Sequence, residues 1–191
     1  MNAKLANYIS ILSHPFLTIP VFVIITLFNH EYFLKAAWIS ALIIGGIFIP
    51  LTVKLYRGKK DGTYTNFDVS NRQQRQTVYA YAITLLGVVT AILFITDQSR
   101  ALQLNMLFSF LLLLSLMLSN YFVKSSLHIA FNTFLSCMLI STIGPLVAIL
   151  FGCVFFIGRA RIVLRRHTLN EVLAGAVLGL IFGITALLVA T

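Results

Sequence analysis

Residues 101–123 read ALQLNMLFSFLLLLSLMLSNYFV and contain no Asp, Glu, Lys or Arg. A helix rises about 1.5 Å per residue, so a segment of this length crosses a hydrocarbon core of about 30 Å. Inside lipid every backbone polar group must be bonded internally, and a helix achieves this within one segment. The stretch therefore predicts a transmembrane helix.

Similar uncharged runs occur on both sides of this segment. We expect further helices over residues 5–28, 36–53, 76–96, 127–142, 145–158 and 170–190. Gly144-Pro145 separates the fifth and sixth of these seven segments, because the uncharged run around it is too long for one crossing. The predicted fold class is all-α: a polytopic transmembrane bundle of six to seven helices.

The composition agrees with a membrane protein. Of the 191 residues, 59% are hydrophobic and only 10% are charged, whereas a soluble domain has about 25% charged residues. The net charge of +9 raises the question of nucleic acid, but the basic residues cluster in two loops between apolar segments. Anionic lipid headgroups or a phosphate substrate explain that clustering better. Cys137 and Cys153 both lie in apolar runs and predict neither a disulfide framework nor a metal site.

The basic residues also predict an orientation. Seven crossings place nearly all Lys and Arg residues on the side that holds the N-terminus, and only Lys35 and Arg100 on the other side. Positive residues favour the cytoplasmic side of a membrane. We therefore expect the N-terminus and its loops in the cytoplasm, with the protein in the plasma (inner) membrane.

The most informative polar segment runs from Arg161 to Glu171, between two apolar runs. Ionisable groups at a membrane edge are costly and mark functional sites by default. An arginine binds phosphate bidentately, and a histidine such as His167, oriented by a carboxylate, acts as nucleophile or base. The spacing predicts chemistry on a phosphate ester at a bilayer surface.

Two other polar segments fall on the same side. Lys124-Ser125-Ser126-Leu127-His128 stands at the start of a helix, where free N–H groups favour an anion, although either serine is equally suited to be an N-cap. Loop 57–75 contains Asp61, Asp68 and Asn71 beside Arg72 and Arg75. A loop whose only role is to orient the protein in the membrane needs Lys and Arg but no acidic or amide residues, so this composition suggests a further role.

On these residues the chain resembles the type 2 phosphatidic acid phosphatase (PAP2) superfamily. That family carries Lys-x6-Arg-Pro, Pro-Ser-Gly-His and Ser-Arg-x5-His-x3-Asp. Here Arg161-x5-His167-x3-Glu171 keeps the third spacing, with Ala160 for Ser and Glu for Asp. Ser125-Ser126-Leu127-His128 keeps the Ser and His of the second, and Asp68-x6-Arg75-Gln76 keeps the Arg of the first.

The resemblance implies a single PAP2-like domain over residues 1–191, with a motif-bearing core at 57–191 preceded by extra N-terminal helices in 1–56. Family members usually place the first two motifs in one loop after three spans. Here two helices precede the first motif, and a helical hairpin separates it from the second. All three motifs still fall on the N-terminal side, so the implied active site faces the cytoplasm.

The resemblance also implies a two-step mechanism without cofactor or metal. His167 would attack phosphorus, Glu171 would orient its ring, and His128 would protonate the leaving oxygen and then activate water. The residues implied around the phosphoryl oxygens are Arg161, Arg75 and Ser126, with Lys124 or Arg72 in place of the missing lysine, and Asp68 and Asn71 as first-motif candidates. The implied partners are a lipid phosphate substrate and membrane lipids, not nucleic acid; the oligomeric state is left open.

The sequence leaves two alternative functions open. A UbiA-like prenyltransferase is suggested by the polar loop residues Asp61, Asn66, Asp68, Asn71 and Arg72, although a second Asp-rich loop is missing. A non-catalytic relative that binds anionic lipid is suggested by the loss of Lys, Pro and Gly from the motifs.

Other residues have structural interpretations. Pro15 and Pro20 predict a kink in the first helix, and we interpret His14 as a helix-packing or interfacial histidine. Gly175, Gly179 and Gly183 are spaced by four residues, which lines one helix face with small residues and permits close packing. We expect that packing within the monomer rather than at a dimer interface.

Overall fold

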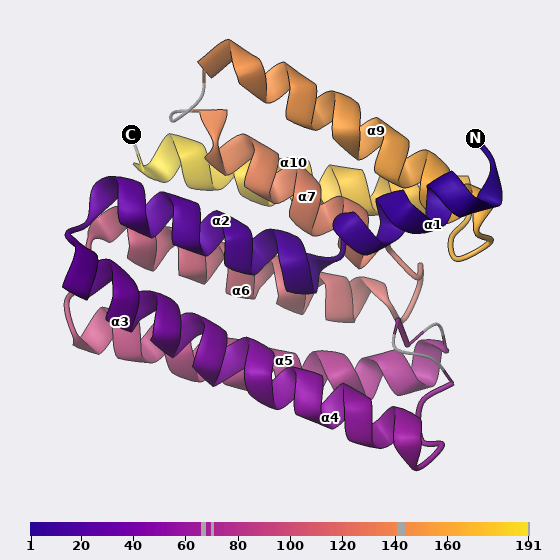
Figure 1. Cartoon of the computed structure of the whole chain (residues 1–191), viewed down its shortest axis with the longest axis horizontal. Helices are drawn as coiled ribbons and strands as arrows, with labels where there is room; N and C mark the ends of the chain where they lie inside the picture. Colours follow the sequence, from indigo (N-terminus) through magenta and orange to yellow (C-terminus); the bar gives the residue numbers. More distant parts are fainter. Residues whose placement is uncertain (66–67, 70, 141–143, 191) are drawn as a thin grey trace.

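The computed structural model describes residues 1–65, 68–69, 71–140 and 144–190. Within these residues the chain is helical and contains no strand, which confirms the predicted all-α class. The helices, shown in Figure 1, are α1 (Ala3–Leu12), α2 (Pro15–His30), α3 (Phe33–Ile43), η1 (Ile44–Phe48), α4 (Ile49–Lys60), α5 (Arg72–Ile95), α6 (Arg100–Ser119), α7 (Leu127–Met138), η2 (Gly144–Leu146), α9 (Val147–Val163) and α10 (Leu169–Ala190).

Several of these helices have the length and composition of membrane spans. In the described part of the chain, five helices are long and apolar enough to cross a bilayer, or six if α1 and α2 count as one bent span. Their outward faces carry many exposed large apolar side chains, among them Leu173, Val177 and Ile181 of α10. These features indicate a membrane protein.

Two helices extend further at their C-terminal ends than predicted. The segment expected at 36–53 is continuous from Phe33 to Lys60, through the π-helical turn η1. The segment expected at 145–158 continues to Val163, so Arg161 lies on α9 rather than in the following turn. Both errors have one cause. Cations are favourable in the last turn of a helix because they face its negative end, so the first charged residue does not mark the end.

The helix predicted over residues 5–28 is broken. α1 and α2 meet at an angle of 43°, with the break at Ser13–His14. Pro15 causes it, because a proline disfavours helical geometry in the preceding residue and fits well at the first position of a new helix. His14 accordingly has ψ 132° and caps α2, with Nδ1 accepting a hydrogen bond from the Phe16 N–H at 3.2 Å. Pro20 lies inside α2.

The short helix α7 lies at the centre of the bundle. It packs against α2, α6, α9 and α10, and nearly all of its residues are buried. A Cβ added at Gly175, Gly179 or Gly183 of α10 would lie 2.6 Å from Ser126 O, 2.4 Å from Ala130 O and 2.7 Å from Cys137 Cβ, respectively. The glycine stripe therefore packs α10 against α7 within the monomer, as predicted. The last residues of the helix predicted at 127–142 lie outside the described residues.

The polar segments gather at one end of the bundle. Figure 1 shows the N-terminus, the segment before α5, the segment before α7 and the turn before α10 at the same end, with the C-terminal end of α10 at the other. The N-terminal helices are part of this assembly, since α1 packs on α9 and α2 packs on α7. Asn132 of α7 donates from Nδ2 to the Ser13 carbonyl at 2.9 Å, which joins the α1–α2 break to the central helix.

Candidate functional site

Arg161 is the most deeply buried charged side chain of this end. It is 2% exposed, and its Nη1 donates to Ser10 Oγ at 2.7 Å and to Asp68 Oδ2 at 3.0 Å. A buried cation requires a paired anion and further hydrogen bonds. α1 and the segment before α5 supply both, although each lies far from Arg161 in sequence.

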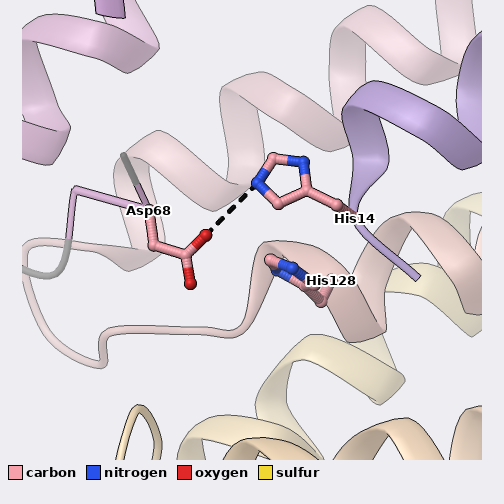
Figure 2. Close-up of side chains that lie close together, drawn as sticks. All are labelled: His14, Asp68 and His128. Carbon is pink, nitrogen blue, oxygen red and sulfur yellow. Dashed lines mark ion pairs between the residues drawn. The ribbon is translucent and has the colours of Figure 1, made fainter. Parts of the chain in front are cut away.

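Asp68 is shared between this arginine and a histidine. The His14 and Asp68 side chains point toward one another in Figure 2, with His14 Nε2 3.2 Å from Asp68 Oδ1. The His14 ring stands edge-on to the His128 ring, with centroids 4.8 Å apart. Burial alone would raise the pKa of Asp68, but the hydrogen bond from His14 and the charge of Arg161 outweigh it and hold that pKa well below its ordinary value. Asp68 is therefore a carboxylate at neutral pH.

His167 and Glu171 form the pair that the spacing predicts. His167 Nδ1 lies 2.9 Å from Glu171 Oε2, and the His167 side chain is 1% exposed. The same carboxylate oxygen accepts from the Thr168 N–H at 3.1 Å, so it also caps the start of α10. The four-residue spacing at a helix start places both side chains on one face. The carboxylate thereby fixes the orientation of the imidazole ring.

Burial and neighbouring cations keep this imidazole neutral. The pKa of His167 is lowered to about 2. Desolvation is the largest cause, the charges of Arg75, Arg161 and Lys124 act in the same direction, and a hydrogen bond with the main chain of Lys124 opposes them. The pKa of Lys124 is also lowered by burial, while the charge of Glu171 opposes this. A neutral imidazole surrounded by cations is suited to attack an anionic centre.

The segment before α7, which contains Ser125 and Ser126, also contributes to the site. Ser126 is the N-cap residue of α7, and its N–H donates to the Glu171 carbonyl at 3.0 Å. Buried Arg75 donates from Nη1 to the Ser125 carbonyl at 3.2 Å. These bonds bring the second and third sequence motifs, and the arginine of the first, into one cluster.

Three buried polar atoms of this cluster have no partner among the described residues: Ser126 Oγ, His128 Nε2 and Arg161 Nε. A buried polar group without a hydrogen bond costs free energy, typically about 1–3 kcal/mol. These atoms belong to side chains predicted to hold a phosphoryl group (Ser126 and Arg161) or to protonate its leaving oxygen (His128), and an anion with several acceptor oxygens would satisfy them.

Two of the predicted site residues have other roles. Asn71 caps α5, accepting from the N–H groups of Gln73 and Gln74. Exposed Arg72 donates from Nε to the Asn120 carbonyl, and Asn120 Nδ2 returns a bond to the Arg72 carbonyl at 3.1 Å. Arg72 thus ties the start of α5 to the end of α6. Asn66, part of the prenyltransferase alternative, lies outside the described residues.

The residues around Asp68 also offer a donor set for a metal. His14, Asp68 and His128 each present one ligand atom, all within 4.8 Å of one another, and two histidines with a carboxylate are a set that zinc accepts. However, His14 and Arg161 already engage both oxygens of Asp68. A cation here would lie beside the guanidinium group of Arg161, so the arrangement favours an ion-paired cluster over a metal centre.

The sequence interpretation gives Ser10 no role, although this residue contacts Arg161. It gives His14 a helix-packing or interfacial role, whereas the structure places His14 in the cluster beside Asp68. The available signal was its position before Pro15. That proline breaks the helix, and the break leaves His14 as a cap with Nε2 directed at Asp68. Sequence alone did not place Asp68 opposite it, since the two residues are far apart in the chain.

Comparisons with known proteins neither support nor contradict the resemblance. No protein-family model, curated protein or solved structure matches this chain.

Proposed function

We propose that this chain is a membrane-embedded lipid phosphate phosphatase, a divergent relative of the PAP2 superfamily, which acts through a phosphohistidine. The observation that carries the proposal is the buried pair His167–Glu171, 2.9 Å apart, in a cluster with Arg75, Arg161 and Lys124 whose charges act on the imidazole. A nucleophile held by an orienting acid beside anion-binding groups is the arrangement expected for phosphoryl transfer.

In the first step, His167 gives up its hydrogen bond with the main chain of Lys124, and the ring nitrogen that faces away from Glu171 attacks phosphorus. The bond from phosphorus to the ester oxygen breaks, and the leaving oxygen takes a proton from the imidazolium form of His128, which the negative charge of the bound phosphate favours. In the second step, His128 removes a proton from water, the water oxygen attacks phosphorus, and the phosphorus–nitrogen bond breaks to release inorganic phosphate. Proton transfer of this kind contributes about 10²–10⁴-fold in rate.

Arg161, Arg75 and Lys124 supply positive charge to the phosphoryl oxygens, and Ser126 Oγ and Arg161 Nε have no other partner in the part of the chain that the structure describes. Phosphoryl transfer depends mainly on positioning and on such charge stabilisation. Asp68 and His14 would act as positioning residues, because they hold the guanidinium group of Arg161 in place. Under this proposal the site requires no metal, and it faces the cytoplasmic side of the inner membrane.

The test is phosphate release from a panel of lipid phosphates by the purified protein in detergent, with a chelator present. We expect His167→Asn to lower the rate by at least about 10⁴-fold, as expected for loss of a nucleophile. His30→Asn is the matched control, because His30 is exposed at the end of α2 and away from the cluster. Retained turnover in His167→Asn would refute the mechanism.

The panel also separates the alternatives. Binding of lipid phosphates by the wild type without turnover of any of them would instead identify a non-catalytic anionic lipid binder. Magnesium-dependent consumption of a prenyl diphosphate with transfer of the prenyl group would identify a prenyltransferase. The site gives no support to the prenyltransferase alternative, which would need carboxylates grouped around magnesium. Asp68 is instead paired with His14 and Arg161.

A further inference from the structure

A long apolar cavity runs into the bundle from the polar cluster. Its volume is about 160 Å³, and α2, α4, α5, α6 and α7 contribute to its walls. The polar end is formed by His14, Asp68, His128, Arg75 and Arg161. The remaining walls are nearly all aliphatic or aromatic, including Phe22, Val23, Leu86, Met106, Leu113 and Phe131.

The cavity is narrow for its length. Along α2 its lining extends from Pro15 to Leu27, which corresponds to roughly 18 Å at 1.5 Å per residue. A volume of about 160 Å³ spread over that length has room for one hydrocarbon chain and not for two side by side. An apolar cavity of similar size, about 150 Å³, stays dry and takes up apolar ligands.

A second pocket lies on the other side of the same ion pair. It has a volume of about 190 Å³ and shares His14 and Asp68 with the apolar cavity. Its other lining residues are polar Asn7, Ser10 and Arg166 and apolar Ile11 and Leu164. The His14–Asp68 pair thus stands between an apolar interior and a polar outer pocket. An amphiphile whose headgroup lies at this boundary and whose tail points inward matches both sides.

We propose that the apolar cavity binds the single hydrocarbon chain of the substrate, so that the site is selective for one-chain lipid phosphates over those with two chains. This inference rests on the proposed function for the headgroup. Its own basis is the apolar lining, the width for one chain and the cationic end at Arg75 and Arg161, which complements a phosphate.

The test is to fill the cavity from its wall. Ala82 of α5 is buried and lines the cavity, whereas Ala80 of the same helix is exposed on the outer face. Ala82→Phe blocks the space, and Ala80→Phe adds the same side chain outside it. Ser109→Phe of α6, which also lines the cavity, is a second blocking variant should the first fail to fold. Folding is checked by size-exclusion chromatography and circular dichroism.

The first readout is binding of two non-hydrolysable probes, dodecylphosphonate and butylphosphonate. Each buried methylene contributes roughly fourfold in affinity, so loss of two or more methylene sites in Ala82→Phe should weaken dodecylphosphonate binding by more than about tenfold. We expect Ala80→Phe to bind dodecylphosphonate with the affinity of the wild type. The affinities of Ala82→Phe and Ala80→Phe for butylphosphonate should differ far less than their affinities for dodecylphosphonate. Equal dodecylphosphonate affinity in folded Ala82→Phe and Ala80→Phe would overturn the inference.

The second readout is turnover of a one-chain and a two-chain lipid phosphate. We expect the wild type to prefer the one-chain substrate in kcat/KM, and Ala82→Phe to lose that preference. Preference for the two-chain substrate would overturn the inference while leaving the phosphatase proposal intact. Conversely, cavity-dependent binding of dodecylphosphonate without any turnover would support the chain site and refute the phosphatase.

Discussion

His14 Nε2 lies 3.2 Å from Asp68 Oδ1, while the other oxygen of Asp68 accepts from Arg161 Nη1 at 3.0 Å. One carboxylate therefore joins the break between α1 and α2 to the buried end of α9. Because Arg161 is 2% exposed, it has little access to water as a substitute partner. The stability of this end of the bundle should depend on the charge of Asp68.

We expect Asp68→Asn to lower the free energy of unfolding by about 3 kcal/mol, since removal of one partner leaves a buried charge unpaired. The measurement is denaturation in detergent, followed by loss of helical circular dichroism. Asp61→Asn is the control, because Asp61 is an exposed carboxylate just after α4 and should change stability by less than about 0.5 kcal/mol. Equal effects of the two substitutions would contradict the role of the Asp68 charge.

A second prediction concerns the acid that orients His167. Glu171→Gln keeps an oxygen that accepts from the Thr168 N–H, but it removes the charge that holds the imidazole and stabilises its positive form during transfer. We expect kcat for lipid phosphate hydrolysis to fall by about 10²–10⁴-fold, with a smaller change in KM. Steady-state phosphate release measures both.

The control for that substitution is Glu31→Gln, which breaks the Glu31–Lys35 pair of 2.9 Å at the other end of the bundle. Both pairs have the same four-residue spacing, but only one contains the proposed nucleophile. A loss of kcat in Glu31→Gln as large as that in Glu171→Gln would show that the effect is not specific to the site.

The pH dependence of stability gives a third prediction. The pKa of His167 is lowered to about 2 in the folded protein, against about 6.5 in an unfolded chain. The unfolded state therefore binds the proton more tightly, and stability falls as the pH drops below 6.5. Between pH 7 and pH 5 this group should remove about 2 kcal/mol.

Comparison of the wild type with His167→Gln isolates the contribution of the His167 imidazole to the pH dependence of stability. The variant lacks the titrating ring, so its free energy of unfolding should fall less than that of the wild type over the same interval, with other histidines contributing equally to both. Denaturation at pH 7 and pH 5 gives the two differences. If they are the same, the His167 ring is not held neutral by the fold.

The sequence was sufficient for the all-α class and for most helix positions, because charge-free segments of this length follow directly from the cost of charges in lipid. It also placed His167 four residues before Glu171, and the local geometry of one helix start then brings them together. Contacts between residues of a single helix or turn could thus be predicted from their spacing in the sequence.

The other part of the site depends on contacts between distant segments. Ser10 and Asp68 reach Arg161, and His14 reaches Asp68, only because α1 packs on α9 and the break at Pro15 redirects the chain. No periodicity or local spacing encodes this. The roles expected for Asn71 and Arg72 likewise could not be separated from capping and helix-tethering roles until the neighbouring elements were placed.

Packing of α10 on α7 gives a fourth prediction. A Cβ at Gly179 would lie 2.4 Å from the Ala130 carbonyl oxygen, a backbone atom that can move only with its helix, whereas nothing lies within 4 Å of a Cβ at Gly152 of α9. We expect Gly179→Ala to destabilise the protein by at least about 1–3 kcal/mol. Gly152→Ala should stabilise it by about 0.4–1 kcal/mol, through the restricted unfolded chain and higher helix propensity. Denaturation in detergent measures both, and a destabilising Gly152→Ala would contradict this account.

Sidedness gives the last prediction. The site lies at the end of the bundle that holds the N-terminus, and the end of α10 lies at the opposite end (Figure 1). Positive residues favour the cytoplasmic side, and this end carries Arg57, Lys59 and Lys60 in the last turn of α4 as well as Arg161 in that of α9. A reporter fused after α10 that is active only outside the cytoplasm should therefore be active, and the same reporter fused before α1 should be silent. The reverse pattern would place the site on the outer face, where an extracytoplasmic lipid phosphate becomes the expected substrate.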